Sequence, residues 1–269
     1  MPPLLYEKKD AIAYITLNRP DKHNAIDPEM AVRLADAWQD YNHDDALRVA
    51  IITGAGDRSF SAGADLGRLI PLLLGNRGPE DEWDHRFVED NYKVFRIALL
   101  KEYALYKPII AAVNGFCFAG GTELLQVTDI RVAASNARFG LPEVTRGLAP
   151  AEVSLTLLPR QIPFCKAMEI LLVGDAIDAE EAWRIGFVNY VVPPRELLPK
   201  AEELARKIVD NGPLAVKLIK QTVLKTSGLT IEMGHKLGEN VRYRLGMSED
   251  AKEGPKAFVE KRRPVYRGR

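Results

Sequence analysis

The pattern of apolar and polar residues predicts short strands separated by helical segments. Residues 11–20 (AIAYITLNRP) have a strand pattern that ends at an Asn-Arg-Pro turn. Residues 48–54 (RVAIITG) and 108–115 (PIIAAVNG) are apolar through their centres, which predicts two buried strands. A further pair of strands is expected within residues 130–143, where IRVAAS precedes ARFGLPE. Strands and helices that alternate in this way indicate an α/β fold.

Helical spacing of apolar residues marks the segments between and after these strands. Asp27 followed by Pro28 fits the N-cap and the first position of a helix. The apolar residues that follow at helical spacing are Met30, Leu34, Trp38 and Tyr41. From Asp178 onwards helical segments dominate, beginning with DAEEAWRIG, which resembles a capping box. We therefore expect one core of strand-and-helix units over residues 1–195 and a mostly helical region over residues 196–269.

Residues 67–95 fit neither pattern throughout. This segment combines a leucine-rich run, a polar turn that contains Gly and Pro, and a charged stretch with helical spacing. A segment of this kind beside an active site can act as a lid, whereas an excursion over the surface is the commoner arrangement. Both interpretations stay open from the sequence.

The overall composition argues against several classes of protein. The chain has 269 residues, of which 37 are Lys or Arg and 37 are Asp or Glu, so its formal net charge is zero. A neutral chain has no global field to attract nucleic acid or an anionic membrane, so a local cluster must bind any anion. The two cysteines, Cys117 and Cys165, lack the CxxC spacing, which argues against a disulfide framework or a structural zinc site.

The apolar segments are also too short for a membrane protein. No uninterrupted apolar stretch approaches the about 20 residues that cross a bilayer. The N-terminal sequence MPPLLYEKKDAIAY has only a short apolar run before its charged residues, unlike a signal peptide. We expect a cytoplasmic protein that binds neither membrane nor nucleic acid.

Candidate chemistry first appears in residues 114–125 (NGFCFAGGTELL). Gly120 and Gly121 follow a predicted buried strand and allow a ligand to approach the backbone without side-chain hindrance. The start of the helix predicted next carries unpaired N–H groups that can bind a ligand oxygen. Glu123 lies about one helical turn further on. Taken alone, an acid in a first helical turn more often stabilises the helix dipole than acts as a catalyst.

Two further segments are ambiguous when taken alone. Glu143 follows Pro142 at the end of a predicted strand, where it is either a functional acid or a solvated loop residue. Residues 52–66 (ITGAGDRSFSAGADL) contain part of a glycine-rich dinucleotide-binding motif, but Ser59 occupies the third glycine position. Simple turns therefore explain these glycines better than NAD binding does.

Taken together, three segments resemble the crotonase superfamily, the enoyl-CoA hydratases and isomerases. These segments are SFSAGADL, NGFCFAGGTEL and RFGLPE, and the likeness extends from ITLNRPDKHNAID near the N-terminus to AFVEKRRP near the C-terminus. The resemblance implies a crotonase-like α/β fold, a spiral of strand–strand–helix turns with a helical C-terminal trimerisation region. Residues 1–195 would form the spiral core with the active site, and residues 196–269 the oligomerisation region.

The resemblance also implies an enzyme, an enoyl-CoA hydratase that adds water reversibly across the 2,3 double bond of a 2-enoyl-CoA thioester. By position, the backbone amides of Ala64 and Gly120 match the family's oxyanion hole. Glu123 and Glu143 match the two glutamates that hold a water in the hydratases, with Glu143 protonating C2 and Glu123 activating the water. Family isomerases usually need one acid–base residue, so the presence of both acids favours a hydratase. An isomerase, a hydroxyacyl-CoA dehydratase and a non-catalytic acyl-CoA-binding protein are the alternatives.

The same resemblance implies where coenzyme A binds. The matching positions on the CoA side are Lys22, His23, Ala62, Asp65 and Leu66. Phe258 and Lys261 match residues that approach the CoA of a neighbouring subunit, since the family forms homotrimers that pair into homohexamers. A solvated helix face is the alternative for the basic residues. Coenzyme A arrives with the substrate, so the resemblance implies no metal and no separate cofactor.

The chain departs from the family pattern after Pro150. Family hydratases usually carry a glycine-rich stretch there, but here the residues are Ala151, Glu152, Val153 and Ser154. The first of those glycines helps to hold the water through its N–H, which an alanine retains. We expect the bulkier residues to reshape the pocket, with Glu152 as a third acid near the site. Residues 67–95 look longer than in short-chain hydratases, which suits a different or larger acyl group.

Overall fold

The structure is a computed structural model that describes residues 1–101 and 103–269. The strands are β1 (Leu4–Lys9), β2 (Ile12–Leu17), β3 (Val49–Gly54), β4 (Ser59–Ser61), β5 (Ile109–Val113), β6 (Phe116–Phe118), β7 (Ile130–Ala134), β8 (Arg138–Gly140), β9 (Ile177–Asp178) and β10 (Tyr190–Val192). The α-helices are α1 (Pro28–His43), α2 (Leu69–Leu73), α3 (Glu82–Ala98), α4 (Gly120–Gln126), α5 (Ser154–Gln161), α6 (Phe164–Val173), α7 (Ala179–Arg184), α8 (Leu197–Val209), α9 (Pro213–Thr226), α10 (Ile231–Gly246) and α11 (Glu249–Val259). The 3-10 helices are η1 (Pro20–Lys22), η2 (Pro142–Arg146) and η3 (Pro194–Glu196).

The strands form two sheets. The larger sheet has the order β1-β2-β3-β5-β7-β10, and the smaller sheet has the order β4-β6-β8-β9. Strands β2, β3, β5, β7 and β10 run parallel, while β1 joins the edge antiparallel to β2. In the smaller sheet β4, β6 and β8 run parallel and β9 is antiparallel. The parallel order means that each successive strand of a sheet is reached by a crossover through helices.

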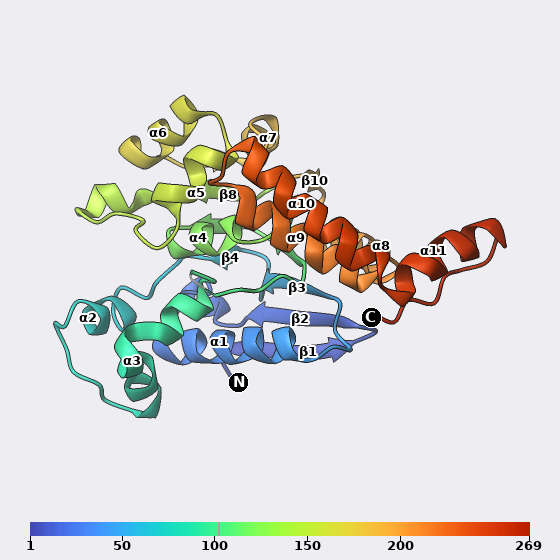
Figure 1. The fold of residues 1–269 in the computed structure, drawn as a ribbon. Helices are drawn as coiled ribbons and strands as arrows, with labels where there is room; N and C mark the ends of the chain where they lie inside the picture. The colour runs from blue at the N-terminus through green and yellow to red at the C-terminus, as the bar shows by residue number, and fades with distance from the viewer. Residues whose placement is uncertain (102) are drawn as a thin grey trace.

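The chain winds through these sheets as a spiral of strand–strand–helix turns (Figure 1). One turn runs through β3, β4 and the helices α2 and α3, and the next runs through β5, β6 and α4. The expected pair of strands within 130–143 is present, but β7 lies in the larger sheet and β8 in the smaller one. This arrangement confirms the crotonase-like fold that the sequence predicted.

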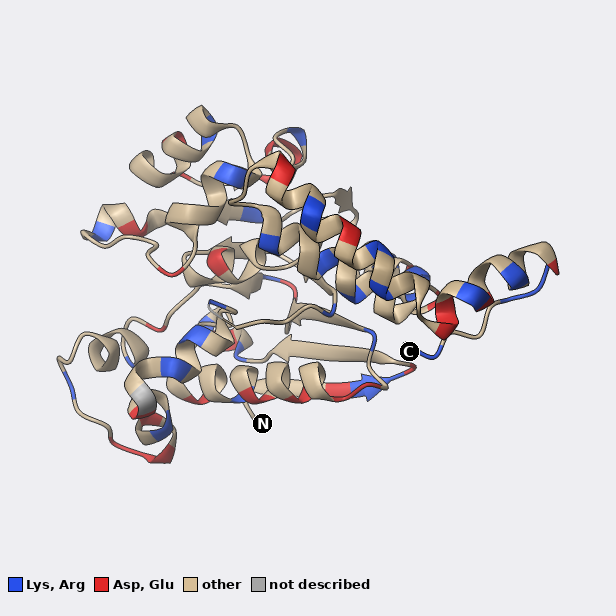
Figure 2. Cartoon of the chain, in the orientation of Figure 1, with Lys and Arg blue, Asp and Glu red and all other residues tan. Residues whose placement is uncertain are grey.

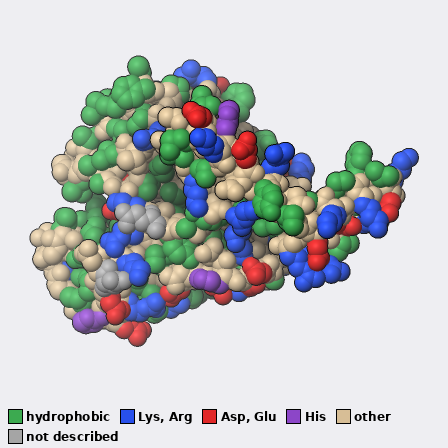
Figure 3. All heavy atoms as spheres, in the orientation of Figure 1, with side chains coloured by type: hydrophobic (Ala, Val, Ile, Leu, Met, Phe, Trp, Pro, Cys, Tyr) green, Lys and Arg blue, Asp and Glu red, His purple; other side chains and the backbone are tan. Residues whose placement is uncertain are grey.

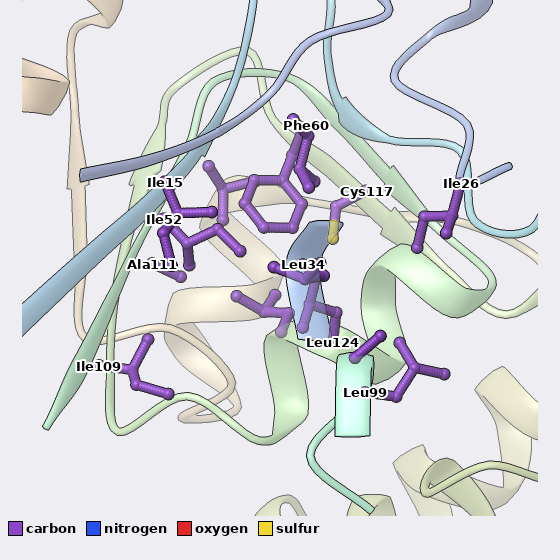
Figure 4. Close-up of a cluster of buried hydrophobic side chains, with 14 of the residues drawn as sticks. Ile15, Ile26, Leu34, Ile52, Phe60, Leu99, Ile109, Ala111, Cys117 and Leu124 are labelled. Carbon is purple, nitrogen blue, oxygen red and sulfur yellow. The ribbon is translucent and has the colours of Figure 1, made fainter. Parts of the chain in front are cut away.

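The main hydrophobic core fills the space between the larger sheet and the elements on one of its faces (Figure 4). Ile15, Ile52 and Ala111 occupy paired positions on β2, β3 and β5, so their side chains point to the same face. Leu34 of α1 and Leu124 of α4 lie in the same cluster. The predicted apolar stripe of α1 is fully buried in this core, which confirms that the stripe packs inward.

The opposite face of the larger sheet is covered by α8. Leu197, Ala201 and Ala205 of this helix form a second buried cluster with strand residues that include Ile51 and Ile110. The helix therefore completes the packing of the sheet although it lies after residue 195. The division of the chain at residues 195 and 196 stays a prediction.

Local signals in the sequence correctly located several element boundaries. The carboxylate of Asp27 accepts a hydrogen bond from the amide of Met30 at 2.8 Å, which is the N-cap expected for α1. Strand β3 ends at Gly54 and leads through a turn into β4 instead of a helix. A Cβ atom on Gly54 would lie 2.3 Å from the carbonyl oxygen of Ser59, so close backbone packing explains this glycine. This packing agrees with the turn that the sequence favoured over NAD binding at these glycines.

Charged residues of both signs are interspersed along the helices, in keeping with the zero net charge (Figure 2). Helices α1 and α3 carry charged residues of both signs, whereas Glu123 is the single charged residue of α4. Within residues 1–101 and 103–269, none of the helices combines the length and the apolar character needed to cross a membrane.

Candidate active site

A cavity of about 550 Å³ collects most of the residues that the sequence singled out. Its volume falls within the range of about 300–1,000 Å³ that is typical of small-molecule sites. The lining residues come from the η1 turn, from the segment after β4, from α2 and α3, from the start of α4, and from η2 and the loop that follows it. Figure 3 shows the surface hollowed between the part of the molecule that contains α2 and α3 and the part that contains α5 and α6.

Two backbone amides meet at one wall of this cavity. Gly63 has a φ of +86°, and a Cβ atom there would lie 2.6 Å from the backbone nitrogen of Gly120. Only glycine permits this approach, which brings the two segments into contact. The backbone nitrogen of Ala64 lies 3.5 Å from the position that a Cβ atom on Gly120 would occupy. Ala64 and Gly120 therefore place their amides side by side, as an oxyanion hole requires.

Both amides are available to a ligand. Among the hydrogen bonds of the described residues, neither the N–H of Ala64 nor that of Gly120 has an acceptor. Gly120 is the first residue of α4, where backbone N–H groups have no partner within the helix. Ala119 precedes it with φ 51° and ψ −128°, a strained conformation for a residue with a side chain. Two unpaired donors that face one cavity can bind an oxygen that carries developing negative charge.

Glu123 is fixed in position by the start of α5. Its residue exposure is 4%, and its carboxylate oxygen Oε1 accepts hydrogen bonds from the amides of Val153 at 2.9 Å and Ser154 at 3.2 Å. Burial raises the pKa of Glu123, while the two amides act in the opposite direction. The carboxylate therefore lines the cavity in one defined orientation.

Glu143 has a different environment on η2. Its oxygen Oε2 is buried and has no hydrogen-bond partner among the described residues. Burial raises the pKa of Glu143 to about 7, and the negative charge of nearby Glu123 adds to the rise, while Arg146 opposes it. A carboxyl group with a pKa near neutrality can both donate and accept a proton at physiological pH. The two acids thus differ in hydrogen bonding, because two amides hold the carboxylate of Glu123 while Oε2 of Glu143 has no partner among the described residues.

The residues in place of the family's glycine-rich stretch have defined contacts. Val153 and Ser154 supply the amides that hold Glu123, and the Ser154 hydroxyl accepts a 2.7 Å hydrogen bond from the side-chain amide of Gln126. The amide of Ala151 donates to the carbonyl oxygen of Ala149 at 2.8 Å. The N–H of Ala151, which the resemblance places near the water, thus has an acceptor within its own loop, and a role in holding the water stays a prediction.

The expected CoA-side residues divide into two groups. Those that line the cavity are Lys22, Ala62, Asp65 and Leu66. His23 does not line it, because its Nδ1 lies 2.7 Å from the hydroxyl of Ser59 and its ring packs edge-on against Phe116. His23 is thus held in the η1 turn next to the cavity and not within it.

Asp65 has a structural role in addition to its place in the cavity wall. Its carboxylate accepts a 2.9 Å hydrogen bond from Arg19 and a second one, also 2.9 Å, from the amide of Gly67. Burial opposes the charge, but these partners together lower its pKa, so the carboxylate stays ionised. Asp65 therefore fixes the turn that carries the Ala64 amide.

Phe258 and Lys261 lie far from this cavity within the chain. Phe258 is 84% exposed at the end of α11, and Lys261 follows that helix. Figure 1 shows α11 projecting from the opposite end of the molecule to α2 and α3. The sequence placed these residues at the CoA of a neighbouring subunit, which stays a prediction.

The structure adds cavity residues that the sequence did not identify. They include Ile70, Leu73, Phe95, Arg146 and Leu148. Residues 67–95 thus form α2, a polar turn and most of α3, and they supply part of the cavity wall. Arg146 lies three residues after Glu143, within the same 3-10 helix η2. This short spacing is the sequence signal that could have identified Arg146 as a neighbour of Glu143 in the cavity.

Comparison with known proteins agrees with this geometry. A model of the enoyl-CoA hydratase/isomerase family matches residues 7–269. The chain is 41% identical to "Enoyl-CoA hydratase EchA19" of Mycobacterium tuberculosis, over 100% of this chain and 97% of that protein. It is 38% identical to "Crotonyl-CoA hydratase" of Syntrophomonas wolfei, over 98% of this chain and 97% of that protein.

Solved structures give the same result. The fold matches the crystal structure of an enoyl-CoA hydratase from Mycobacterium tuberculosis H37Rv with a TM-score of 0.88 and 38% sequence identity. The match covers 100% of both chains. The likeness in sequence, in fold and in the cavity residues leads to one assignment. The chain belongs to the enoyl-CoA hydratase/isomerase family.

Proposed function

We propose that the chain is an enoyl-CoA hydratase, a hydro-lyase that adds water reversibly across the 2,3 double bond of a 2-enoyl-CoA thioester. The observation that carries the proposal is the meeting, in one cavity, of two unpaired backbone amides with two acids whose pKa values burial raises. Coenzyme A belongs to the substrate, so the proposed reaction uses no metal and no redox cofactor.

The amides of Ala64 and Gly120 would bind the thioester oxygen. Addition of water at C3 places negative charge on this oxygen as the enolate forms. Donors that are already oriented stabilise that charge without reorganisation, and the loss of one such donor typically raises the activation free energy by about 3–4 kcal/mol. Lys22, Ala62, Asp65 and Leu66 would then contact the CoA part of the substrate, with His23 supporting the same turn.

The two acids would handle the water and its proton. Glu123, whose orientation is fixed by α5, would accept a proton from the water as its oxygen attacks C3. Glu143, with a pKa of about 7, would deliver a proton to C2 of the enolate. One O–H bond of water and the C2–C3 π bond break, while a C3–O and a C2–H bond form. Each acid–base role typically contributes about 10²–10⁴-fold in rate.

A double-bond isomerase is the second candidate. Glu143 combines a buried unpaired oxygen with a pKa near neutrality, and one such acid can move a proton between two carbons. Dehydration of a hydroxyacyl-CoA is the reverse of the proposed reaction and uses the same groups. A protein that binds acyl-CoA without turnover would not require Glu123 and Glu143 together.

Hydration of trans-2-butenoyl-CoA tests the proposal through loss of the conjugated thioester absorbance. We expect Glu123→Gln and Glu143→Gln each to lower kcat by about 10²–10⁴-fold. Glutamine at position 123 keeps an oxygen for the amides of Val153 and Ser154, so the fold should persist. Glu29→Gln, on α1 and outside the cavity, is the control and should be fully active. Near-normal hydration by Glu123→Gln would refute the two-acid mechanism.

The proposal includes a cytoplasmic homotrimer or homohexamer in which residues 196–269 contribute the subunit contacts. Support comes from apolar side chains that are exposed on the last three helices. They include Ile219, Val223, Ile231, Met233, Tyr243 and Phe258. Phe258 and Lys261 would reach the CoA of a neighbouring subunit. Light scattering of the purified protein tests the assembly, and a monomer at micromolar concentration would contradict it.

A further inference from the structure

An ion pair ties an acid of the cavity wall, Glu152, to the segment that follows α3. The Nζ atom of Lys101 lies 3.3 Å from Oε2 of Glu152 and 3.4 Å from the carbonyl oxygen of Ala151. Lys101 follows α3, whereas Glu152 precedes α5 and itself lines the cavity. Both side chains are partly exposed, at 33% for Lys101 and 24% for Glu152. The pair therefore connects the cavity wall at Glu152 with the end of α3, at a place that solvent still reaches.

The position of the reacting atoms indicates what this pair would meet. A thioester oxygen bound by the amides of Ala64 and Gly120 places C2 and C3 beside the two acids. The amide of Val153 holds Glu123, and Glu152 is the residue before it. Acyl carbons from C4 onwards therefore extend towards the loop that carries Glu152. An acyl chain that grows in this direction would meet the Lys101–Glu152 pair.

The remaining wall on this side is apolar. It is formed by Ile70 and Leu73 of α2, Phe95 of α3, and Leu148 of the loop after η2. An apolar acyl chain packs favourably against this wall, with a gain in affinity of about 4-fold for each buried CH₂ group. The same chain would lose affinity wherever it removed water from the ion pair.

We propose that the Lys101–Glu152 pair determines acyl-chain length by closing the cavity beyond the first few acyl carbons. This inference rests on the proposed hydratase function and adds a specificity-determining pair to it. Short, unbranched enoyl thioesters fit inside the closed pair. Longer chains must separate or desolvate it, so the wild-type protein should turn them over with lower kcat/KM.

The test compares 2-butenoyl-CoA with 2-octenoyl-CoA in variants without the charges. Lys101→Met keeps the length of the aliphatic stem, and Glu152→Gln keeps the shape of the side chain. Each should raise the octenoyl-to-butenoyl ratio of kcat/KM by about 10-fold, because several CH₂ groups gain an uncharged surface. The double variant should shift the ratio less than the product of the single shifts, since both variants remove one contact.

A matched control comes from α3, the helix that Lys101 follows. Arg86 on α3 forms an exposed ion pair with Asp36 on α1, at 2.9 Å and outside the cavity. Arg86→Met removes a charge and the ion pair that joins α3 to α1, and it leaves the residues that line the cavity unchanged. Its octenoyl-to-butenoyl ratio should equal that of the wild type. A shift as large as in Lys101→Met would refute the inference, because any loosening of α3 would then suffice.

A different role for Glu152 has a different signature. The negative charge of Glu152 raises the pKa of Glu123, so Glu152 could act on the reaction through that acid. Lys101→Met and Glu152→Gln would then shift the pH profile of kcat/KM in opposite directions and equally for both substrates. That outcome, with an unchanged ratio, would overturn the inference about chain length.

Failure of this inference differs from failure of the proposed function. If the wild-type protein hydrates no enoyl-CoA of any length, the proposed function is wrong and the inference falls with it. If the wild type hydrates both substrates but neither variant changes the ratio by more than 2-fold, only the inference is refuted. Circular dichroism checks that each variant folds. If Lys101→Met does not fold, the ratio measured for Glu152→Gln alone tests the inference about chain length.

Discussion

Glu143→Gln should make the protein more stable at high pH while it removes activity. Burial raises the pKa of Glu143 from its ordinary value of 4.5 to about 7 in the folded chain. Between these values the unfolded chain loses the proton while the folded chain keeps it, so stability falls as pH rises through this window. Below pH 4.5 both states are protonated and the penalty is absent. Above pH 7 it is complete.

The size of the effect follows from the pKa difference. One pKa unit corresponds to about 1.4 kcal/mol, which gives an upper limit of about 3 kcal/mol for Glu143. The residue is partly exposed, and solvent near the carboxyl reduces this to about 2 kcal/mol. Glutamine does not ionise, so its cost as a buried polar group is the same at every pH.

Urea unfolding of the wild type and of Glu143→Gln at pH 5 and pH 8 measures the effect. The difference in unfolding free energy between the two proteins should move by about 1–2 kcal/mol in favour of Glu143→Gln from pH 5 to pH 8. The same variant should hydrate 2-butenoyl-CoA about 10²–10⁴-fold more slowly. Glu29→Gln provides the control for a change of charge outside the cavity. A stability difference that is independent of pH would refute the reasoning, because it would mean that Glu143 ionises normally in the folded protein.

Other variants test the supports of the site. Gly63→Ala should lower kcat by about 10²–10³-fold in the hydration assay, since a methyl group would displace the amide that begins α4; full activity would show that the contact is not needed. Asp84→Ala should destabilise the protein by about 3–5 kcal/mol in urea unfolding, because the fully buried Asp84 side chain pairs with Arg77. A decrease in unfolding free energy below about 1 kcal/mol would mean that this pair does not hold the segment between α2 and α3 in place. Ser154→Ala should destabilise by about 1–3 kcal/mol, because it leaves the side-chain amide of Gln126 without its acceptor, and an unchanged unfolding curve would contradict this.

The parts of the fold that the sequence predicted are those with strong local signals. The N-cap at Asp27 depends on a contact three residues away, and the buried face of α1 depends on a repeat of 3.6 residues. The central strands β3 and β5 were predicted because their apolar runs are buried on both faces by α8 and by the main core.

The short strands were not predicted, for a physical reason. Strands β4, β6 and β9 contain two or three residues each, too few to display an alternating pattern. Their pairing is between segments far apart in the sequence, so only the folded chain identifies them. The segment after Pro150 shows the same limit. The sequence indicated a departure from the family's glycine-rich stretch there, but it could not predict the hydrogen bonds that the amides of Val153 and Ser154 donate to Glu123.

The site residues divide in the same way. The positions of Glu123, Glu143 and Gly120 could be predicted because family resemblance fixes them within short motifs. Their different environments could not, since the pKa of Glu143 depends on burial by residues from several elements. The Lys101–Glu152 pair joins residues that are 51 positions apart and carries no local signal.

The hydrogen bonds between Glu123 and the start of α5 have an evolutionary consequence. The same carboxylate oxygen that orients the acid also satisfies two amides at the beginning of a neighbouring helix. A descendant that drifted away from hydration could not discard this acid freely, because doing so would expose a folding defect before any new chemistry was gained. Replacements that retain a side-chain oxygen, such as glutamine, should therefore precede others along any lineage in which this site changes its reaction.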